Sequence, residues 1–271
     1  MNKYKHLVVA GDSWTYGSEI KDPSLSADVR DWDEENDSYR LPRIWPTKLG
    51  TKIDAEKVVN LSYPASSNDR IIRTLYSWLA QEYFVTEKDT SDLFVVVGFT
   101  SPERKDFFFD DQSENFRDWI TLWPMLNWTH PMKNLQSFNE LYVNYFWNEE
   151  EYVHRYLEQI FNLQTVFKQY KINYLMFQAF YQKEDLHILN WNDNPYARHF
   201  NGRADKLLWK LIDPVRFMHK NDSIHSFHNY ILDRDTSKEK TISISGMHPS
   251  EIAHTWWAEH IYQYCEEHKI W

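Results

Sequence analysis

Short apolar segments separated by helical patterns constrain the fold of this chain more than any other feature. Four segments are rich in Val, Ile, Leu or Phe and lack a clean alternation of apolar and polar residues: 6–10, 58–61, 93–97 and 174–177. Strands of this composition are typical of a parallel sheet that is covered on both faces. The pattern therefore predicts an α/β domain with an open, mostly parallel sheet between helices.

Three longer stretches carry apolar residues at helical spacing. The first begins at Asn68, which we expect to be the N-cap of its helix. The second runs from Ser137 to about Tyr170 as one long amphipathic stretch. The third follows His248 and has Pro249 in its first turn. We expect these stretches to cover the faces of the sheet.

Three further segments exceed what a minimal α/β domain needs. Residues 18–40 are acidic and rich in turn formers, residues 105–134 are aromatic, and residues 182–240 have no clear periodicity. We expect one domain over 1–271, with a solvated acidic loop and with the other two insertions covering the carboxyl edge of the sheet. The 13 Trp, 17 Tyr and 16 Phe indicate bulky packing or, less often, a groove that stacks on sugars.

Charge and cysteine content exclude several classes of protein. The net charge of -10 argues against broad binding of nucleic acid or anionic membranes. A single cysteine, Cys265, excludes an internal disulfide, and no stretch has the length of a signal-peptide core or a membrane span. We therefore expect a soluble, cytoplasmic protein. The histidine pairs lack a third ligand at metal spacing, so no metal and no cofactor are expected, and the sequence carries no sign of oligomeric state.

Polar residues follow the predicted strands at points that a parallel sheet brings to one edge. Ser13 follows the first strand, SYPASSND follows the second, GFTSPER follows the third, and His248 opens the final helix. Ligands of open α/β sheets lie beyond the carboxyl ends of the strands. A serine paired with a histidine suits acyl transfer, so we interpret Ser13 as a nucleophile and His248 as its base.

The segments GDSWTYG, NLSYPASSNDR, VVVGFTSPER and HPSEIAHTWWAEHI resemble, in this order, the blocks of the SGNH (GDSL-type) hydrolase family, and more narrowly SGNH-like proteins of bacteria and phages. The resemblance implies a flavodoxin-like three-layer αβα sandwich, with Ser13 as nucleophile and His248 as base. An α/β-hydrolase is disfavoured, because GDSWT is not G-x-S-x-G and only one strand can precede Ser13.

Two positions of the oxyanion site depart from the family's pattern. Ala65 stands at or near the glycine whose amide faces the oxyanion, and Thr100 replaces the asparagine that donates from its side chain. Losing one such donor costs about 3 kcal/mol in a preorganised site. Asn68, at the start of the neighbouring helix, is a second candidate donor.

The residue that orients the histidine ring also differs from the family's pattern. The acid three residues before it in the family falls at Ser245. A backbone carbonyl, or an acid from the last insertion such as Asp233 or Asp235, could orient the ring instead. Asp12 is interpreted as a structural partner of nearby amides. Arg104 either binds an acidic ligand group or bonds loop carbonyls, and the second role is commoner for an arginine at a strand end.

These observations predict a serine esterase without a cofactor. Ser13 attacks a carbonyl, His248 moves the proton, and Ser13 N–H, Ala65 N–H and either Thr100 or Asn68 hold the oxyanion. The expected substrate is a small-molecule or carbohydrate ester, with an O-acyl sugar as the specific suggestion. The alternatives are a non-catalytic ligand- or glycan-binding module on the same fold, and an acyltransferase.

Overall fold

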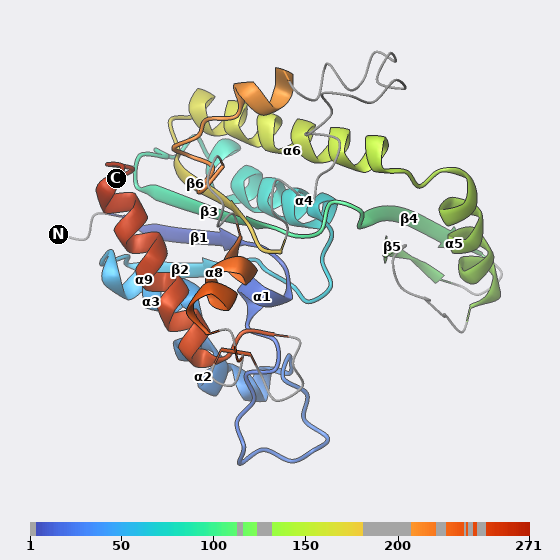
Figure 1. Ribbon diagram of the computed structural model, residues 1–271, viewed down its shortest axis with the longest axis horizontal. Helices are drawn as coiled ribbons and strands as arrows, with labels where there is room; N and C mark the ends of the chain where they lie inside the picture. The colour runs from blue at the N-terminus through green and yellow to red at the C-terminus, as the bar shows by residue number, and fades with distance from the viewer. Residues whose placement is uncertain are drawn as a thin grey trace.

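The computed structural model describes residues 4–112, 116–123, 132–180, 207–220, 226–235, 237, 241–242 and 248–271. Its centre is a four-stranded parallel sheet in the order β2-β1-β3-β6 (Figure 1). The strands are β1 (His6–Ala10), β2 (Lys57–Asn60), β3 (Leu93–Phe99) and β6 (Asn173–Gln178). All four predicted strands are confirmed, each end within two residues of its expected place.

The strand order creates a switch point beside β1. In register, Val8 of β1 lies between Val59 of β2 and Val95 of β3. The chain therefore leaves β1 toward β2 on one side and reaches β3 on the other. In open α/β sheets the crevice at such a reversal, beyond the carboxyl ends of the strands, is where ligands bind.

Helices cover both faces of the sheet and make three layers (Figure 1). Alternate residues of the strands point into two separate apolar cores. On one face Val8, Val95 and Val97 pack with α4 (Asn68–Leu79) and α6 (Glu149–Gln169). On the other face Leu7, Val9 and Val96 pack with α3 (Trp45–Lys52), α8 (Phe227–Arg234) and α9 (Glu251–Glu267). This is the flavodoxin-like three-layer αβα arrangement.

The helix boundaries differ from the expected ones at three points. The N-cap of α4 is Ser67, whose hydroxyl accepts from Arg70 N–H, so Asn68 is the first helical residue. The stretch expected as one helix from Ser137 is two helices, α5 (Lys133–Tyr145) and α6. Asn148 separates them, because its side chain caps α6 by accepting from Glu151 N–H. The N-cap of α9 is Ser250, which leaves Pro249 just outside the helix.

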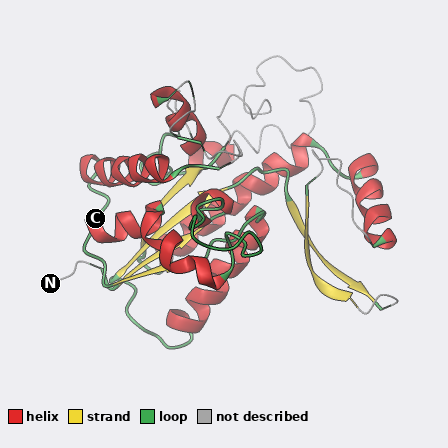
Figure 2. Cartoon of the chain, turned by 90° about the horizontal axis from the view of Figure 1, so that it is seen from below, coloured by secondary structure: helices red, strands yellow, loops and turns green. Residues whose placement is uncertain are grey.

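The insertion at 105–134 contains an antiparallel hairpin that sequence analysis did not predict. It consists of β4 (Lys105–Asp111) and β5 (Phe116–Leu122). The ring of Phe107 lies 5.0 Å from the rings of both Phe138 and Tyr142 on α5. Figures 1 and 2 show the hairpin and α5 projecting from the sheet as an arm. The base of the arm contacts the loops at the carboxyl edge, through Asp106 on Ser67 and Trp123 on Arg104, while the rest of its described part extends away from the sheet.

The acidic insertion at 18–40 is exposed over much of its length, as expected of a solvated loop, and it also contains short helices. It contains η1 (Glu34–Asn36) and α2 (Asp37–Arg40), and η2 (Leu41–Arg43) then leads to α3. The buried side chain of Asn36 donates to the carbonyls of Ile20 and Asp31 and accepts from Asp22 N–H. One buried amide thus ties three points of the loop together.

The last insertion lies partly outside the described residues, which omit 181–206, 221–225, 236 and 238–240. Its described parts extend the sheet edge beside β6, through bridges from Met176 to Phe217 and from Gln178 to Ser226. None of the helices in the described part of the chain combines the length and the apolar character that a bilayer span requires.

Candidate active site

Ser13 lies at the carboxyl end of β1, where it begins the short helix α1 (Ser13–Tyr16). Asp12 caps this helix by accepting from Trp14 N–H at 3.0 Å. Gly17 ends it at φ 86°, where a side chain would be strained and a Cβ would lie 2.2 Å from Ile44 Cγ2. The serine is 8% exposed, and its backbone N–H donates to no other described residue. The switch point thus presents a hydroxyl beside an unused amide donor.

Asp12 joins the ends of β1 and β3. Its second carboxylate oxygen, Oδ2, accepts from Thr100 Oγ1 at 2.6 Å, and the group is fully buried. The guanidinium of Arg104 lies 3.9 Å from the same oxygen. The structural interpretation of Asp12 agrees with these contacts. Thr100 is different from expectation, because its single hydroxyl hydrogen is already donated to Asp12. We therefore leave the Thr100 side chain out of the oxyanion donors.

The side chain of Asn68 lies beside Thr100 and is held by two hydrogen bonds to the Thr100 backbone. Asn68 Oδ1 accepts from Thr100 N–H at 2.9 Å, and Asn68 Nδ2 donates to Thr100 O at 3.2 Å. A side-chain amide carries two hydrogens, so one remains for a ligand. Since the residue is fully buried and clamped from both sides, that hydrogen has a fixed direction. Asn68 meets the requirement for a preorganised donor better than Thr100 does.

Ala65 has a backbone conformation that normally belongs to glycine. Its φ is 57°, in the left-handed region, which costs a residue with a Cβ roughly 1–2 kcal/mol. The side chain is exposed, and the backbone N–H donates to no described residue. The amide that the sequence singled out is therefore available. Strain of this kind persists where the surrounding structure imposes it, commonly at functional sites.

Arg104 bonds the loop that carries Ala65. Its Nη1 donates to Ser66 O at 3.1 Å, and its guanidinium lies 4.1 Å from the centre of the Trp123 ring. The residue is 5% exposed. Of the two roles left open by the sequence, these contacts match the bonding of loop carbonyls.

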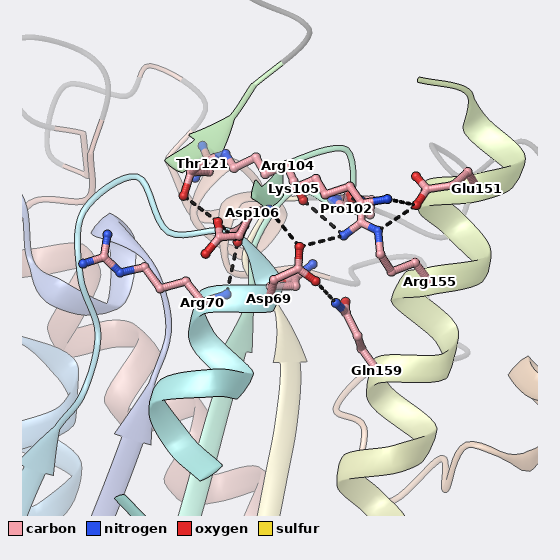
Figure 3. A network of polar contacts seen from close by, with 12 residues as sticks. Asp69, Arg70, Pro102, Arg104, Lys105, Asp106, Thr121, Glu151, Arg155 and Gln159 are labelled. Atoms are coloured by element: carbon pink, nitrogen blue, oxygen red, sulfur yellow. Dashed lines mark hydrogen bonds and ion pairs between the residues drawn. The ribbon is translucent and has the colours of Figure 1, made fainter. Parts of the chain in front are cut away.

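A network of buried and partly buried polar groups joins the base of the arm to α4 and α6 (Figure 3). Asp106 of β4 accepts from Ser67 Oγ at 2.5 Å, from Thr121 Oγ1 at 2.7 Å and from Arg73 Nη2 at 2.8 Å. Asp69, in the first turn of α4, accepts from Asp106 N–H and from Gln159 of α6. The turn that carries Asn68 is thus bonded both to the arm and to the helix layer.

Arg155 of α6 completes this network. It donates to the carbonyls of Pro102 and Arg104 at 3.0 and 3.2 Å, and it forms an ion pair with Glu151 (Figure 3). Lys105 pairs with the same glutamate. The loop after β3 is therefore held from the side of α6 as well as from the loop after β2.

His248 lies just before α9, and its Nδ1 is 2.9 Å from Oε1 of Glu19. Both side chains are partly buried, and the approach has the distance of an ion pair without the alignment of a hydrogen bond. Glu19 belongs to the loop that follows Ser13, and Ser13 O accepts from the N–H groups of Gly17 and Ser18. The residue expected as the base is thus joined to the loop that begins at the expected nucleophile.

Glu19 was missed by sequence analysis. Of the residues suggested there, Asp235 accepts from Thr241, and Ser245 lies outside the described residues. Nothing in the spacing of the acidic loop distinguishes Glu19 from its neighbours. Its one unusual property, a φ of 69°, is visible only in the structure.

His254 is a structural residue on α9. It is fully buried, and its Nδ1 accepts from Trp45 N–H at 3.3 Å. Burial, with smaller contributions from Lys48 and His248, lowers the pKa of His254 to about 3. The ring is therefore neutral at physiological pH and docks the start of α9 on α3, as the interpretation of His254 as a packing residue requires.

Of the two aromatic residues that follow Ser13, Trp14 is buried and Tyr16 lies nearer the surface. Trp14 is buried against Phe180 and Phe227, with ring centres 4.9 and 5.4 Å away. Tyr16 lies 6.5 Å from the half-exposed ring of Tyr63, and its hydroxyl donates to Trp32 O. Trp32 also lines a surface hollow of about 710 Å³, together with Asp33, Glu34 and Glu35.

Solved structures similar to this chain include several esterases. A crystal structure of TesA is 11% identical, with a TM-score of 0.45 over 97% of this chain and 99% of that chain. The esterase EstA from Pseudoalteromonas sp., inhibited by monoethylphosphonate, is 10% identical, with a TM-score of 0.44 over 97% of both chains. A lipolytic G-D-S-L family protein from Veillonella parvula is 13% identical, with a TM-score of 0.42 over 95% of this chain and 98% of that chain.

Comparison with protein families identifies a family for most of this chain. No curated protein matches the chain. A family model described as "Family of unknown function (DUF6071)" matches residues 25–268. The matched range contains Ala65, Asn68, Thr100 and His248, and it begins after Ser13 and Glu19. This chain is a member of the DUF6071 family.

Proposed function

We propose that the protein hydrolyses esters by a serine mechanism, with Ser13 as nucleophile and His248 as base. The observation that carries the proposal is the contact between His248 and Glu19, because it joins the imidazole to the loop that starts at Ser13. Ser13 itself lies at the switch point of the sheet, where open α/β proteins bind ligands.

The unused donors support the same chemistry. Ser13 N–H, Ala65 N–H and the second hydrogen of Asn68 Nδ2 are the groups proposed to stabilise the oxyanion. Ser13 Oγ attacks the carbonyl carbon of the ester while its proton moves to His248. The imidazolium then protonates the departing alkoxide and leaves an acyl-serine, which water cleaves with His248 acting again as base.

A non-catalytic binding module on the same fold is the second candidate. The hydrogen bond from Thr100 to Asp12 favours it, because it removes one of the side-chain donors that an oxyanion site would use. Such a module would keep a ligand site at the switch point without an activated serine.

A fluorophosphonate probe tests the first candidate against the second. An activated serine displaces fluoride from phosphorus and becomes covalently labelled. We expect the folded protein to be labelled at Ser13, as located by peptide mass spectrometry, and to release 4-nitrophenol from 4-nitrophenyl acetate. Both signals should fall at least about 10³-fold in Ser13→Ala.

Ser18→Ala is the matched control. Ser18 lies in the same loop, is also buried, and its hydroxyl has no hydrogen-bond partner among the described residues. The control should therefore keep full labelling and activity. A wild-type protein that is folded but is labelled no faster than Ser13→Ala would exclude the hydrolase and leave the binding module.

A further inference from the structure

We infer that Glu19 is the positioning residue for His248, and that the acid supporting the base comes from the loop of the nucleophile. The inference rests on the proposed function. It names a residue that no sequence pattern indicates, and it accounts for the missing acid at Ser245. Glu19 acts through the imidazole and not on the substrate.

The contact assigns the two ring nitrogens of His248 to different tasks. Since Nδ1 faces the Glu19 carboxylate at 2.9 Å, the proposed mechanism assigns the transfer of the serine proton to Nε2. A carboxylate this close to Nδ1 favours the tautomer with hydrogen on Nδ1, and its negative charge stabilises the imidazolium that forms when the serine ionises. Neither task requires the acid to lie near the histidine in the sequence.

The backbone holds Glu19 in place for this contact. Its φ of 69° is unfavourable for a residue with a Cβ, and its N–H donates to Asp31 Oδ2 at 2.5 Å. Asp31 is itself bonded through its carbonyl to the buried side chain of Asn36. A strained residue persists where neighbouring bonds impose its conformation, and here those bonds direct a carboxylate at an imidazole.

The same segment carries the nucleophile. Between Ser13 and Glu19 the chain makes one helical turn, closed by Gly17 and by hydrogen bonds from Gly17 and Ser18 to Ser13 O. The segment is therefore short and internally bonded. The proposed nucleophile and positioning acid therefore belong to one bonded turn, and His248 contacts it from the other end of the chain.

Substitution of Glu19 tests the inference with the probe that tests the function. We expect Glu19→Gln to reduce the rate constant for labelling of Ser13, and kcat for 4-nitrophenyl acetate, by about 10²–10⁴-fold with little change in KM. Glu19→Asp, which keeps the charge, should recover part of the rate. Asp28→Asn, at an exposed position of the same acidic loop, is the matched control and should behave as wild type.

A second test separates positioning from a general effect on structure. In a His248→Ala background, Glu19→Gln should reduce the remaining rate by less than about threefold, because the residue it acts through is gone. In the wild-type protein, ¹⁵N-histidine NMR should show His248 as the tautomer with hydrogen on Nδ1, with its signals assigned by their loss in His248→Ala. This measurement needs no substitution at Glu19.

The outcomes distinguish the inference from the proposed function. If wild type is labelled at Ser13 while Glu19→Gln matches Asp28→Asn, or if His248 carries its hydrogen on Nε2, Glu19 is not the positioning residue and the hydrolase still stands. If Ser13 is not labelled in the folded wild type, the hydrolase itself is wrong and the inference falls with it.

Discussion

At the strand ends the candidate site is held by short hydrogen bonds between fully buried groups, whereas beside α9 it depends on a contact between two partly exposed side chains. The strand-end side consists of Asp12, Ser13, Asn68 and Thr100, and its bonds join the ends of β1 and β3 to the first turn of α4. The histidine side consists of His248 and Glu19.

The two sides differ in how much the surroundings can change them. Buried hydrogen bonds between strand ends are shielded from solvent, and losing one partner leaves an unsatisfied group. A partly exposed ion pair is weaker and is screened by salt. The nucleophile is therefore preorganised by the sheet, while the position of the base depends on a loop and on the docking of α9.

Acid should have the largest effect on the docking of α9 against α3, which depends on His254. The pKa of His254 is about 3 in the folded protein and near 6.5 in an unfolded chain, so between these values the unfolded state binds the proton first. Stability falls as the pH drops through this window, by on the order of 2 kcal/mol at pH 5 for this one group. Urea unfolding at pH 7 and pH 5 measures the loss.

His254→Asn should remove only part of this loss, because an asparagine side chain can still accept from Trp45 N–H but does not titrate. The rest should remain, since burial lowers the pKa of His260 on the same helix to about 3 as well. His154→Asn, on the opposite helix layer, is the matched control and should keep the wild-type dependence. Equal slopes in His254→Asn and wild type would show that acid weakens the fold elsewhere.

Thr100→Val should show how far the strand-end side depends on one hydroxyl. The substitution keeps the shape of the side chain but leaves Asp12 Oδ2 without its donor in a fully buried site. We expect a loss of about 1–3 kcal/mol in the free energy of unfolding. Thr100→Ser, which keeps the hydroxyl, should lose clearly less. Two variants of equal stability would mean that this hydrogen bond does not hold the strand ends together.

Ala65→Gly should have the smallest effect and the opposite sign. Glycine adopts a φ of 57° without the strain that alanine carries there, although its larger backbone entropy in the unfolded state offsets part of the gain. A stabilisation of less than about 1 kcal/mol is expected by thermal unfolding, with the rate of Ser13 labelling retained because the amide is unchanged. A destabilised variant would argue that the Ala65 side chain has a packing role.

Sequence analysis predicted the strands that are buried on both faces, because the same apolar environment surrounds every residue of such a strand. The strands at 6–10 and 93–99 are apolar on both faces because both faces are covered, and this leaves a plain signal. β4 has one face on α5 and one exposed, but three successive phenylalanines, 107–109, conceal that alternation. Likewise Phe146 and Trp147 continue the apolar pattern across the break between α5 and α6.

In the candidate site, too, some features could be predicted from the sequence and others could not. The positions of Ser13, Ala65 and Asn68 follow from where strands end, which is a local property of the chain. The bond that occupies the Thr100 hydroxyl and the contact between Glu19 and His248 join residues far apart in the sequence. No local pattern encodes such pairs, because each depends on how separate loops meet after folding.

The hydrogen bonds of Asp106 restrict how the base of the arm can move relative to α4. This carboxylate is a pivot that serves β5 through Thr121 and the start of α4 through Ser67 and Arg73. The base of the arm cannot move without either breaking these hydrogen bonds or moving the start of α4 with it. A load applied to the arm is therefore transmitted to the turn that holds Asn68.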